Sequence, residues 1–219
     1  MAVIFGTRGK DILKGTSKSD LILAGDGDDK VDAGGGNDFV LSGAGDDRVD
    51  AGSGNDYIDG GRGNDVLFGG AGDDVIKGGR GDDFMFGGSG NDVFQFRGRY
   101  DAGDLAFGGS GIDKIVNVHC SNLTFENFNG SYQSIEIVDA NWRDIDGTHR
   151  DNVLDFRGTT LVRFRLIDAN GGDDVVYGSE GGETIQGDRG DDRLYGEGGD
   201  DELDGGRGRD LLDLSLIHI

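Results

Sequence analysis

The sequence predicts an all-β solenoid in which short strands alternate with tight turns. A nine-residue unit, G-G-x-G-[N/D]-D-x-U-x with U a large apolar residue, recurs ten times in unbroken register over residues 6–95. Position eight of the unit is apolar in every copy, and position six is an aspartate in every copy. A fixed period of this kind is typical of repeat proteins, in which each unit buries its apolar side against its neighbours.

Each unit predicts one turn followed by one short strand. Glycines at positions one, two and four permit the positive φ angles and close backbone approach that a tight turn requires. The tail x-U-x is too short for a helix and suits a strand of about three residues, whose middle side chain points away from its neighbours. Position eight therefore lines the interior, with Leu13, Ile22, Val31, Val40, Val49, Ile58, Leu67, Ile76, Met85 and Phe94. Positions seven and nine face outward and are largely compatible with solvent, as in Lys30, Asp32, Arg48, Asp50, Asp59 and Lys77.

Stacking of the turns brings the position-six carboxylates close together. Neighbouring coils lie about 4.8 Å apart, so aspartates of successive coils face one another. Like charges at this distance repel strongly unless a cation lies between them. Carboxylate and carbonyl oxygens are hard ligands that select Ca²⁺ over softer metals, and Ca²⁺ accepts irregular shells of six to eight oxygens. The pattern therefore indicates calcium.

The clearest copies, GGRGNDVLF (60–68) and GGAGDDVIK (69–77), resemble the nonapeptides of the repeats-in-toxin (RTX, hemolysin-type calcium-binding) family. The resemblance implies a right-handed parallel β-roll, a β-helix solenoid in which two GGxGxDxUx nonapeptides form one coil. It also implies Ca²⁺ between repeat n and repeat n+2, bound by the position-six carboxylate and by carbonyl oxygens of the glycine turns. The eight copies that match the full turn, starting at residues 24, 33, 42, 51, 60, 69, 78 and 87, then predict six sites in this block.

Carried over residue by residue, the resemblance assigns metal ligation to two groups of residues. The aspartates are Asp29, Asp38, Asp47, Asp56, Asp65, Asp74, Asp83, Asp92, Asp113, Asp174, Asp192, Asp201 and Asp210. The turn glycines are Gly27, Gly36, Gly45, Gly54, Gly63, Gly72, Gly81 and Gly90. The first two copies depart from the pattern, with Lys10 at position five of one and Lys18 at position four of the other. We expect these two copies to cap the roll more than to bind an ion.

The remaining chain is less regular. A break at residues 96–98 precedes a weak copy (99–107) and a good one (108–116), which complete a first calcium-binding β-roll at 6–116. Residues 117–168 lose the glycine turns but show strand patterns at 134–140, 152–156 and 161–169. We expect irregular parallel β-coils without calcium turns there, with Trp142 and several phenylalanines in a bulkier core.

Five copies over residues 169–213 form a second predicted calcium-binding block, in which Glu183 replaces the usual aspartate and is expected to weaken its site. The last residues, LSLIHI (214–219), resemble a translated sequencing adapter. We expect them to be a non-native tail on a chain that continues in nature, with a short terminal strand as the alternative.

Composition favours a fold that depends on the ion. The 219 residues include 45 glycines and no proline, and the formal net charge is −22. Such a chain would tend to disorder, but bound Ca²⁺ offsets charge, and its binding free energy becomes folding free energy. We therefore expect an expanded chain without calcium and an ordered one with it. The acidity argues against nucleic-acid binding, and no apolar run approaches the length of about 20 residues that a membrane span needs.

Other chemistry finds little support in the sequence. A single cysteine, Cys120, forms no internal disulfide. His119 beside it suggests a soft metal site only weakly, because zinc needs three or four ligands at recognisable spacing. No H-E-x-x-H or G-x-S-x-G motif occurs, so we expect no catalytic site in this chain.

Two alternatives concern the turns themselves. The position-six aspartates could simply be turn formers that bond the local backbone, although stacked copies favour calcium ligation. The position-five residues are expected to be turn formers or outer groups rather than direct ligands: Asp28, Asn37, Asp46, Asn55, Asn64, Asp73, Asp82 and Asn91.

The leading interpretation is a monomeric module that calcium folds and stabilises, within a secreted bacterial protein. As the resemblance implies, it would leave the cell by the type I secretion machinery if the full-length chain carries a C-terminal signal. The alternatives are a fragment of a larger secreted RTX toxin or hydrolase, or a cell-surface adhesin with residues 117–168 as its binding face. Sequence beyond residue 213 would separate these interpretations. Ice binding is rejected, because position three shows no regular threonine ladder.

Overall fold

The computed structural model describes residues 1–97, 103–119 and 121–214. The chain divides into two compact units: the first contains Met1–Phe96 and Gly103–Ile115, and the second contains Arg97 and the residues from Val116 onward. Both are built from parallel strands, with one short helix, α1 (Gly130–Gln133), in the second. The predicted all-β solenoid is confirmed.

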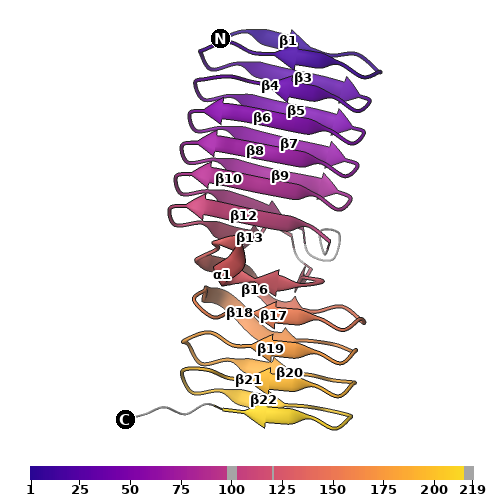
Figure 1. Ribbon diagram of the computed structural model, residues 1–219, viewed down its shortest axis with the longest axis vertical. Coiled ribbons are helices and arrows are strands. Elements are labelled where there is room, and N and C mark those ends of the chain that lie inside the picture. Colours follow the sequence, from indigo (N-terminus) through magenta and orange to yellow (C-terminus); the bar gives the residue numbers. More distant parts are fainter. Residues whose placement is uncertain (98–102, 120, 215–219) are drawn as a thin grey trace. The chain divides into compact units, whose positions relative to one another are not determined.

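Strands of the first unit alternate between two parallel sheets (Figure 1). One sheet has the order β1 (Val3–Phe5), β3 (Leu21–Asp26), β5 (Phe39–Ala44), β7 (Tyr57–Arg62), β9 (Val75–Arg80), β11 (Val93–Phe96) and β13 (Lys114–Asn117), the last of which contains the boundary between the units. The other has the order β2 (Ile12–Lys14), β4 (Lys30–Asp32), β6 (Arg48–Ser53), β8 (Val66–Ala71), β10 (Phe84–Ser89) and β12 (Leu105–Ser110).

The register of these sheets follows the repeat. Val40 pairs with Ile58, and Ile58 pairs with Ile76, so one coil spans 18 residues, or two nonapeptides. Between β10 and β12 the spacing grows to 21 residues, and Met85 pairs with Ala106. The three extra residues near the predicted break are therefore accommodated without a change of register.

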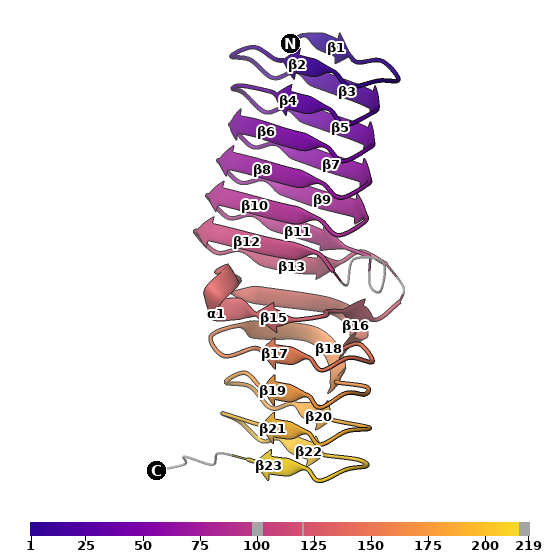
Figure 2. The same cartoon turned by 45° about the vertical axis from the view of Figure 1, so that its right-hand side comes forward.

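The second unit repeats this plan, with two long strands, β16 (Ile137–Asp146) and β18 (Thr160–Asp168), followed by strands of three residues (Figure 2). In one sheet, β16, β18, β20 (Thr184–Gln186) and β22 (Glu202–Asp204) follow in order, and β14 (Leu123–Thr124) also pairs with β16. The other has the order β15 (Phe128–Asn129), β17 (Val153–Asp155), β19 (Val175–Tyr177), β21 (Arg193–Tyr195) and β23 (Leu211–Asp213).

Position-eight side chains, which point between the sheets, form most of the core of the repeats, together with small position-one residues such as Ala24 and Ala51. Ile58, Leu67 and Ile76 are fully buried, and Val176 is fully buried in the second unit. Burial decreases in the terminal coils, where Leu212 is 45% exposed. The interior positions were therefore predictable from the period alone.

The core of residues 117–168 is aromatic, but one predicted member is absent from it. Phe128 lies between Phe125 and Phe156, with ring centroids 4.9 and 5.0 Å away. Trp142, by contrast, is 66% exposed. The pairing of β16 with β18 shifts register between Asp139 and Arg143, and Trp142 itself has a φ of 63°. This irregularity turns the indole out of the strand's inward–outward alternation, which the sequence pattern did not indicate.

The outward positions are less polar than the charged side chains of the first block suggested. Phe68, Phe86 and Phe107 stack along β8, β10 and β12 with centroid separations of 4.9 and 5.1 Å. The guanidinium of Arg48 lies 4.5 Å from the Phe68 ring centre. Within the described chain, no helix is both long and apolar enough to cross a bilayer. Cys120 and all of the predicted tail except Leu214 lie outside the described residues.

Candidate calcium sites in the stacked turns

The position-six aspartates end each turn immediately before a strand. Asp65 and Asp83 are fully buried, and Asp74 is 1% exposed. Burial follows from the repeat. Position six, position eight and position one of the next unit are two residues apart, so in an extended chain all three face inward. The structure thus places a carboxyl group inside the protein at most of the glycine turns, while Asp201 and Asp210 near the end of the second unit are half-buried.

One oxygen of each carboxyl group is bonded to the neighbouring coil. The backbone N–H of Asp47 donates to Oδ1 of Asp65 at 2.8 Å, and the N–H of Asp65 donates to Oδ1 of Asp83 at 2.8 Å. The second unit has the same arrangement, in which Asp174 N–H donates to Asp192 Oδ1 at 2.8 Å. The alternative that these aspartates bond the local backbone is not what Oδ1 shows, because its bond runs to the neighbouring coil and not within the turn.

The second oxygen, Oδ2, is buried. Within the described chain it has no hydrogen-bond partner at Asp29, Asp38, Asp47, Asp56, Asp65, Asp74, Asp92, Asp174, Asp192 and Asp201. A buried anionic oxygen without a donor costs several kcal/mol, so such atoms are rare unless a proton or a cation compensates them. Their recurrence along both units points to a ligand that the repeat is built to receive.

Backbone oxygens converge on the same places. A Cβ atom built on Gly60 would lie 2.5 Å from Asp65 Oδ2 and 2.5 Å from the carbonyl oxygen of Gly78 in the next coil. In the second unit, a Cβ on Gly187 would meet Asp192 Oδ2 and the carbonyl oxygen of Gly205. The missing side chain leaves a cradle lined by a carboxylate and a carbonyl.

The glycines at positions two and four serve a different purpose. Gly61 and Gly63 have φ angles of +103° and +118°, which side chains rarely adopt. The carbonyl oxygens of Gly43 and Gly45 lie directly against them. All eight predicted position-four glycines share this conformation: Gly27, Gly36, Gly45, Gly54, Gly63, Gly72, Gly81 and Gly90. These glycines let carbonyls of adjacent coils approach each other.

Burial also changes the acidity of the carboxyl groups. It raises the pKa of Asp65 to about 8, and the facing carboxylates of Asp83 and Asp47 add to the rise. The pKa of Asp74 rises to about 7 and that of Asp174 to about 7, again chiefly through burial. Without a cation the neutral acid of Asp65 is therefore favoured at neutral pH, and a bound cation would lower these pKa values and favour the carboxylates.

The donor set fits a hard, oxygen-seeking ion. In the described part of the chain, His, Cys, Asp and Glu side chains do not gather in threes at any potential metal site. An ion in these turns would consequently take most of its ligands from carbonyls and one or two from carboxylates. Ca²⁺ accepts such shells readily, whereas Zn²⁺ prefers nitrogen and sulfur.

Most of the predicted residues occupy equivalent places. Asp83 and Asp113 are fully buried, and their Oδ1 atoms accept the N–H groups of Asp65 and Asp92 at 2.8 Å. Asp210, in the last described coil, is half-buried, and its Oδ1 accepts the Asp192 N–H at 3.1 Å.

The position-five side chains form a second ladder of hydrogen bonds. The Oδ1 atom of Asp46 accepts the N–H of Asn64 at 2.8 Å, and the Oδ1 of Asp73 accepts the N–H of Asn91 at 2.8 Å. These bonds run in the opposite direction to those of position six, since here the later coil donates to the earlier one. These contacts link neighbouring coils, and a role as turn formers or outer groups stays a prediction.

Sequence reasoning missed two members of these rows. Asp104, in the weak copy, is 4% exposed, and its Oδ1 accepts the Asp83 N–H at 2.9 Å. Asn152, in the segment GTHRDNVLD (147–155), takes the place of an aspartate, and its N–H donates to Asp174 Oδ1 at 2.7 Å. The Gly-Thr start shared with the first two repeats was the available signal, but the segment is out of phase with them.

The predicted structural role of His119 has one contact to support it: its Nδ1 lies 3.3 Å from the Ser121 amide nitrogen.

Comparison with protein families agrees with this geometry. The model of the RTX calcium-binding nonapeptide repeat matches residues 5–40, 41–67, 59–94, 166–182 and 177–212, which together cover more than half of the chain. No curated protein matches the chain significantly.

Proposed function

Because the chain belongs to the RTX calcium-binding nonapeptide repeat family, we propose that its glycine turns bind Ca²⁺ between successive coils and that these ions make the fold stable. The chain is a calcium-binding β-roll module of that family. The observation that carries the proposal is the row of buried Oδ2 atoms without donors, several of which, as at Asp65, Asp74 and Asp192, lie close to a carbonyl of the next coil. When bound, Ca²⁺ supplies the positive charge that these oxygens lack.

The aspartates and glycines predicted from the resemblance are the proposed ligands. Each aspartate offers Oδ2, since its Oδ1 is held by the N–H of the adjacent coil, as in Asp65. The glycine turns offer carbonyls. The two proposed calcium-binding blocks are residues 6–116 and 169–213, separated by coils without such turns at 117–168.

Calcium would then act as a folding trigger. A chain with a net charge of −22 that brings carboxylates into register repels itself strongly. Each bound ion removes two charges from this excess and links two coils. Metal binding of this kind adds directly to the free energy of folding, because the unfolded chain has no preformed site.

We also propose a secreted, extracellular bacterial protein, since this mechanism suits transfer between compartments. Where calcium is scarce the chain would remain expanded, and it would fold where calcium reaches the 10⁻⁴–10⁻³ M that extracellular modules require. Export by type I secretion machinery fits this order of events. Comparing export and folding of the tagged protein with and without external calcium tests this part.

The direct test is far-UV circular dichroism of the full chain during titration with CaCl₂, with MgCl₂ as the control. We expect a cooperative gain of β signal with calcium only. Magnesium demands a smaller and more regular octahedral shell, so it should fail at the same concentration. A β signal that is already complete in EGTA and unchanged by calcium would refute the folding role.

A further inference from the structure

Four turns satisfy their position-six side chain without an ion. They share a serine or threonine at position two, where the other repeat copies whose position two is described have a residue with positive φ. The pairs of position-two and position-six residues are Thr7 with Asp11, Thr16 with Asp20, Thr148 with Asn152, and Ser179 with Glu183. We call these the hydroxyl-closed turns.

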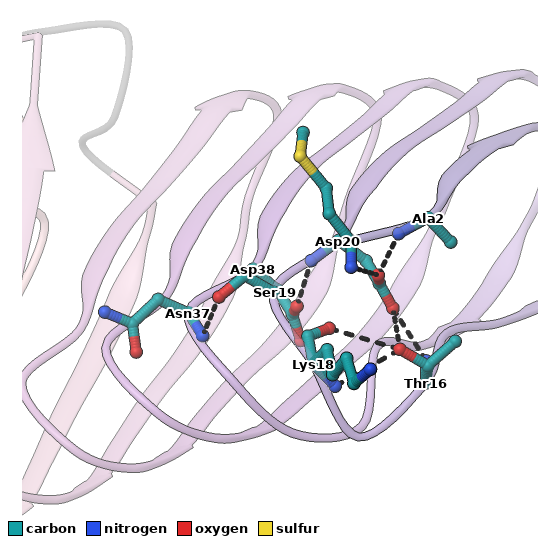
Figure 3. Close-up of polar contacts among 8 residues, drawn as sticks. Ala2, Thr16, Lys18, Ser19, Asp20, Asn37 and Asp38 are labelled. Atoms are coloured by element: carbon teal, nitrogen blue, oxygen red, sulfur yellow. Dashed lines mark hydrogen bonds and ion pairs between the residues drawn. The ribbon is translucent and has the colours of Figure 1, made fainter.

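Figure 3 shows the hydrogen bonds of one such turn. The Thr16 hydroxyl donates to Asp20 Oδ2 at 2.7 Å, and the Thr16 backbone N–H donates to the same oxygen at 2.7 Å. The other oxygen, Oδ1, accepts the N–H of Ala2. The Lys18 N–H donates to the Thr16 hydroxyl oxygen at 3.2 Å. Both carboxylate oxygens of Asp20 therefore have donors within the protein, and these bonds lower its pKa.

The other three turns repeat these contacts. The backbone N–H donates to position six at 2.6 Å from Thr7, 2.6 Å from Thr148 and 3.0 Å from Ser179. The hydroxyl accepts the N–H of Arg150 at 3.3 Å in one turn and that of Gly181 at 3.0 Å in another.

The backbone conformation differs in the same way. None of these four turns has a residue with positive φ at position two or four, although all eight positions lie in the described chain. We call the turns that are proposed to bind calcium calcium-type turns. They keep positive φ at position two even where that residue is not glycine, as at Asn170 (71°), Asp188 (66°) and Glu197 (67°). A non-glycine residue in this region is uncommon and needs support from its surroundings. The sequence thus encodes two distinct turns within one nine-residue frame.

Charge at position six is not required in a hydroxyl-closed turn. Asp11 and Asp20 keep the aspartate, but Glu183 has a longer side chain and Asn152 has an uncharged amide. The Asn152 Oδ1 accepts the Thr148 N–H, while its Nδ2 donates to the Glu126 carbonyl at 2.6 Å. An amide in this place has no anionic oxygen to offer a cation.

The position of these turns in the fold is regular. The N–H to Oδ1 bonds join the position-six residues into four stacks: 11, 29, 47, 65, 83 and 104; 20, 38, 56, 74, 92 and 113; 152, 174, 192 and 210; and 183 and 201. Each stack begins with a hydroxyl-closed turn. In the described chain no GGxGxD turn precedes the first turn within its stack, so this turn has a neighbour proposed to bind calcium only on the side of the following coil. Contacts such as Ala2 N–H to Asp20 and Asn152 to the Glu126 carbonyl come from the preceding side.

We propose that the hydroxyl-closed turns are calcium-independent caps, one at the start of each stack of calcium turns. The hydroxyl and the backbone N–H replace the ion for the position-six side chain. The cap then presents its own position-six N–H to Oδ1 of the first calcium-type aspartate, as Asp20 does to Asp38 at 2.7 Å. This inference rests on the proposed calcium binding, which it refines by stating which turns bind no ion.

The test compares isosteric substitutions along one stack. Asp11→Asn preserves an oxygen for the Thr7 donors, so the number of bound calcium ions should be unchanged and the folding midpoint should move less than about twofold. Asp65→Asn removes an anionic oxygen that has no donor, and we expect the loss of at least one ion. Glu183→Gln and Asp192→Asn form the matched pair in the second unit. Stoichiometry is measured by calorimetric titration of the full chain with CaCl₂.

A second pair of variants tests the hydroxyl itself. Thr16→Val should leave the stoichiometry unchanged but lower the folded-to-unfolded ratio in saturating calcium about fivefold, because one partly buried hydrogen bond to Asp20 is lost. Thr16→Ser keeps the bond and is the control. Loss of an ion in Asp11→Asn or Glu183→Gln, or an unaffected Thr16→Val, would overturn the proposal. Absence of calcium uptake by the unmodified chain would instead refute the proposed function.

Discussion

Acidification should stabilise the calcium-free roll. Burial, followed by the charges of neighbouring aspartates, raises the pKa of Asp65 to about 8 and that of Asp74 to about 7, from a value of 3.8. The folded chain therefore binds more protons than the unfolded chain between about pH 4 and pH 8. Its stability is highest at the acid end of this window and is lost as the pH rises through the folded-state pKa values.

The size of the effect can be bounded from the structure. At about 1.4 kcal/mol for each unit of pKa, Asp65 alone destabilises the calcium-free fold by at most about 6 kcal/mol above pH 8. Whole domains are stable by only about 5–15 kcal/mol. A few such groups are thus enough to keep the roll unfolded at pH 8 without calcium, even though neighbouring sites titrate together and their effects do not add.

The assay is circular dichroism of the full chain in EGTA over pH 5–8, with a urea titration at each pH. We expect β signal and the urea midpoint to increase as the pH falls. Asp65→Asn, which has no titratable group at this site, should show a weaker dependence on pH. Calcium binding should release protons near pH 7, detectable as a calorimetric heat that depends on the buffer. A calcium-free stability that decreases from pH 8 to pH 5 would refute the reasoning.

Three further outcomes can be checked on the same protein. Replacing Asp65 and Asp83 together by alanine should raise the calcium concentration at the folding midpoint, and an unchanged midpoint in a dichroism titration would contradict their role as ligands. Leu67→Asp should prevent ordering at any calcium concentration, because it exchanges several kcal/mol of buried apolar contact for a buried charge; a normal β signal would be inconsistent with the inward position of Leu67. Converting Thr16 and Lys18 together to glycine restores a complete GGxGxD turn and should add one bound calcium ion by calorimetric titration, a gain that would fail to occur if these residues did not exclude the ion.

The period made most of the fold accessible from sequence. Interior positions such as Ile58 and Leu67 and the placement of Asp65 follow from nine-residue spacing with alternating strand side chains, whereas the 18-residue coil was implied by the resemblance to the RTX family. Trp142 was misplaced because its orientation depends on a register shift between two strands, a tertiary feature without a local pattern.

The candidate site was only half predictable. Which residues gather at a turn could be derived from the repeat. That Oδ1 accepts an N–H of the adjacent coil while Oδ2 has no donor could be seen only from the geometry between coils. The role of Thr16 was missed because a threonine in a glycine position reads as a simple departure from the consensus. Its hydroxyl contacts a side chain four residues ahead, and that contact exists only when the turn adopts its other conformation.

The 18-residue coil limits how the length of such a chain can change during evolution. Removing or duplicating a single nonapeptide would move every later strand to the opposite sheet. Each later aspartate would then belong to the other stack of position-six residues. Whole coils can be gained or lost without this disturbance, and so can short insertions in the connecting loops. The 21-residue step from Asp83 to Asp104 is an insertion of the second kind. Natural length variants of the first unit should therefore differ by multiples of 18 residues, apart from loop insertions.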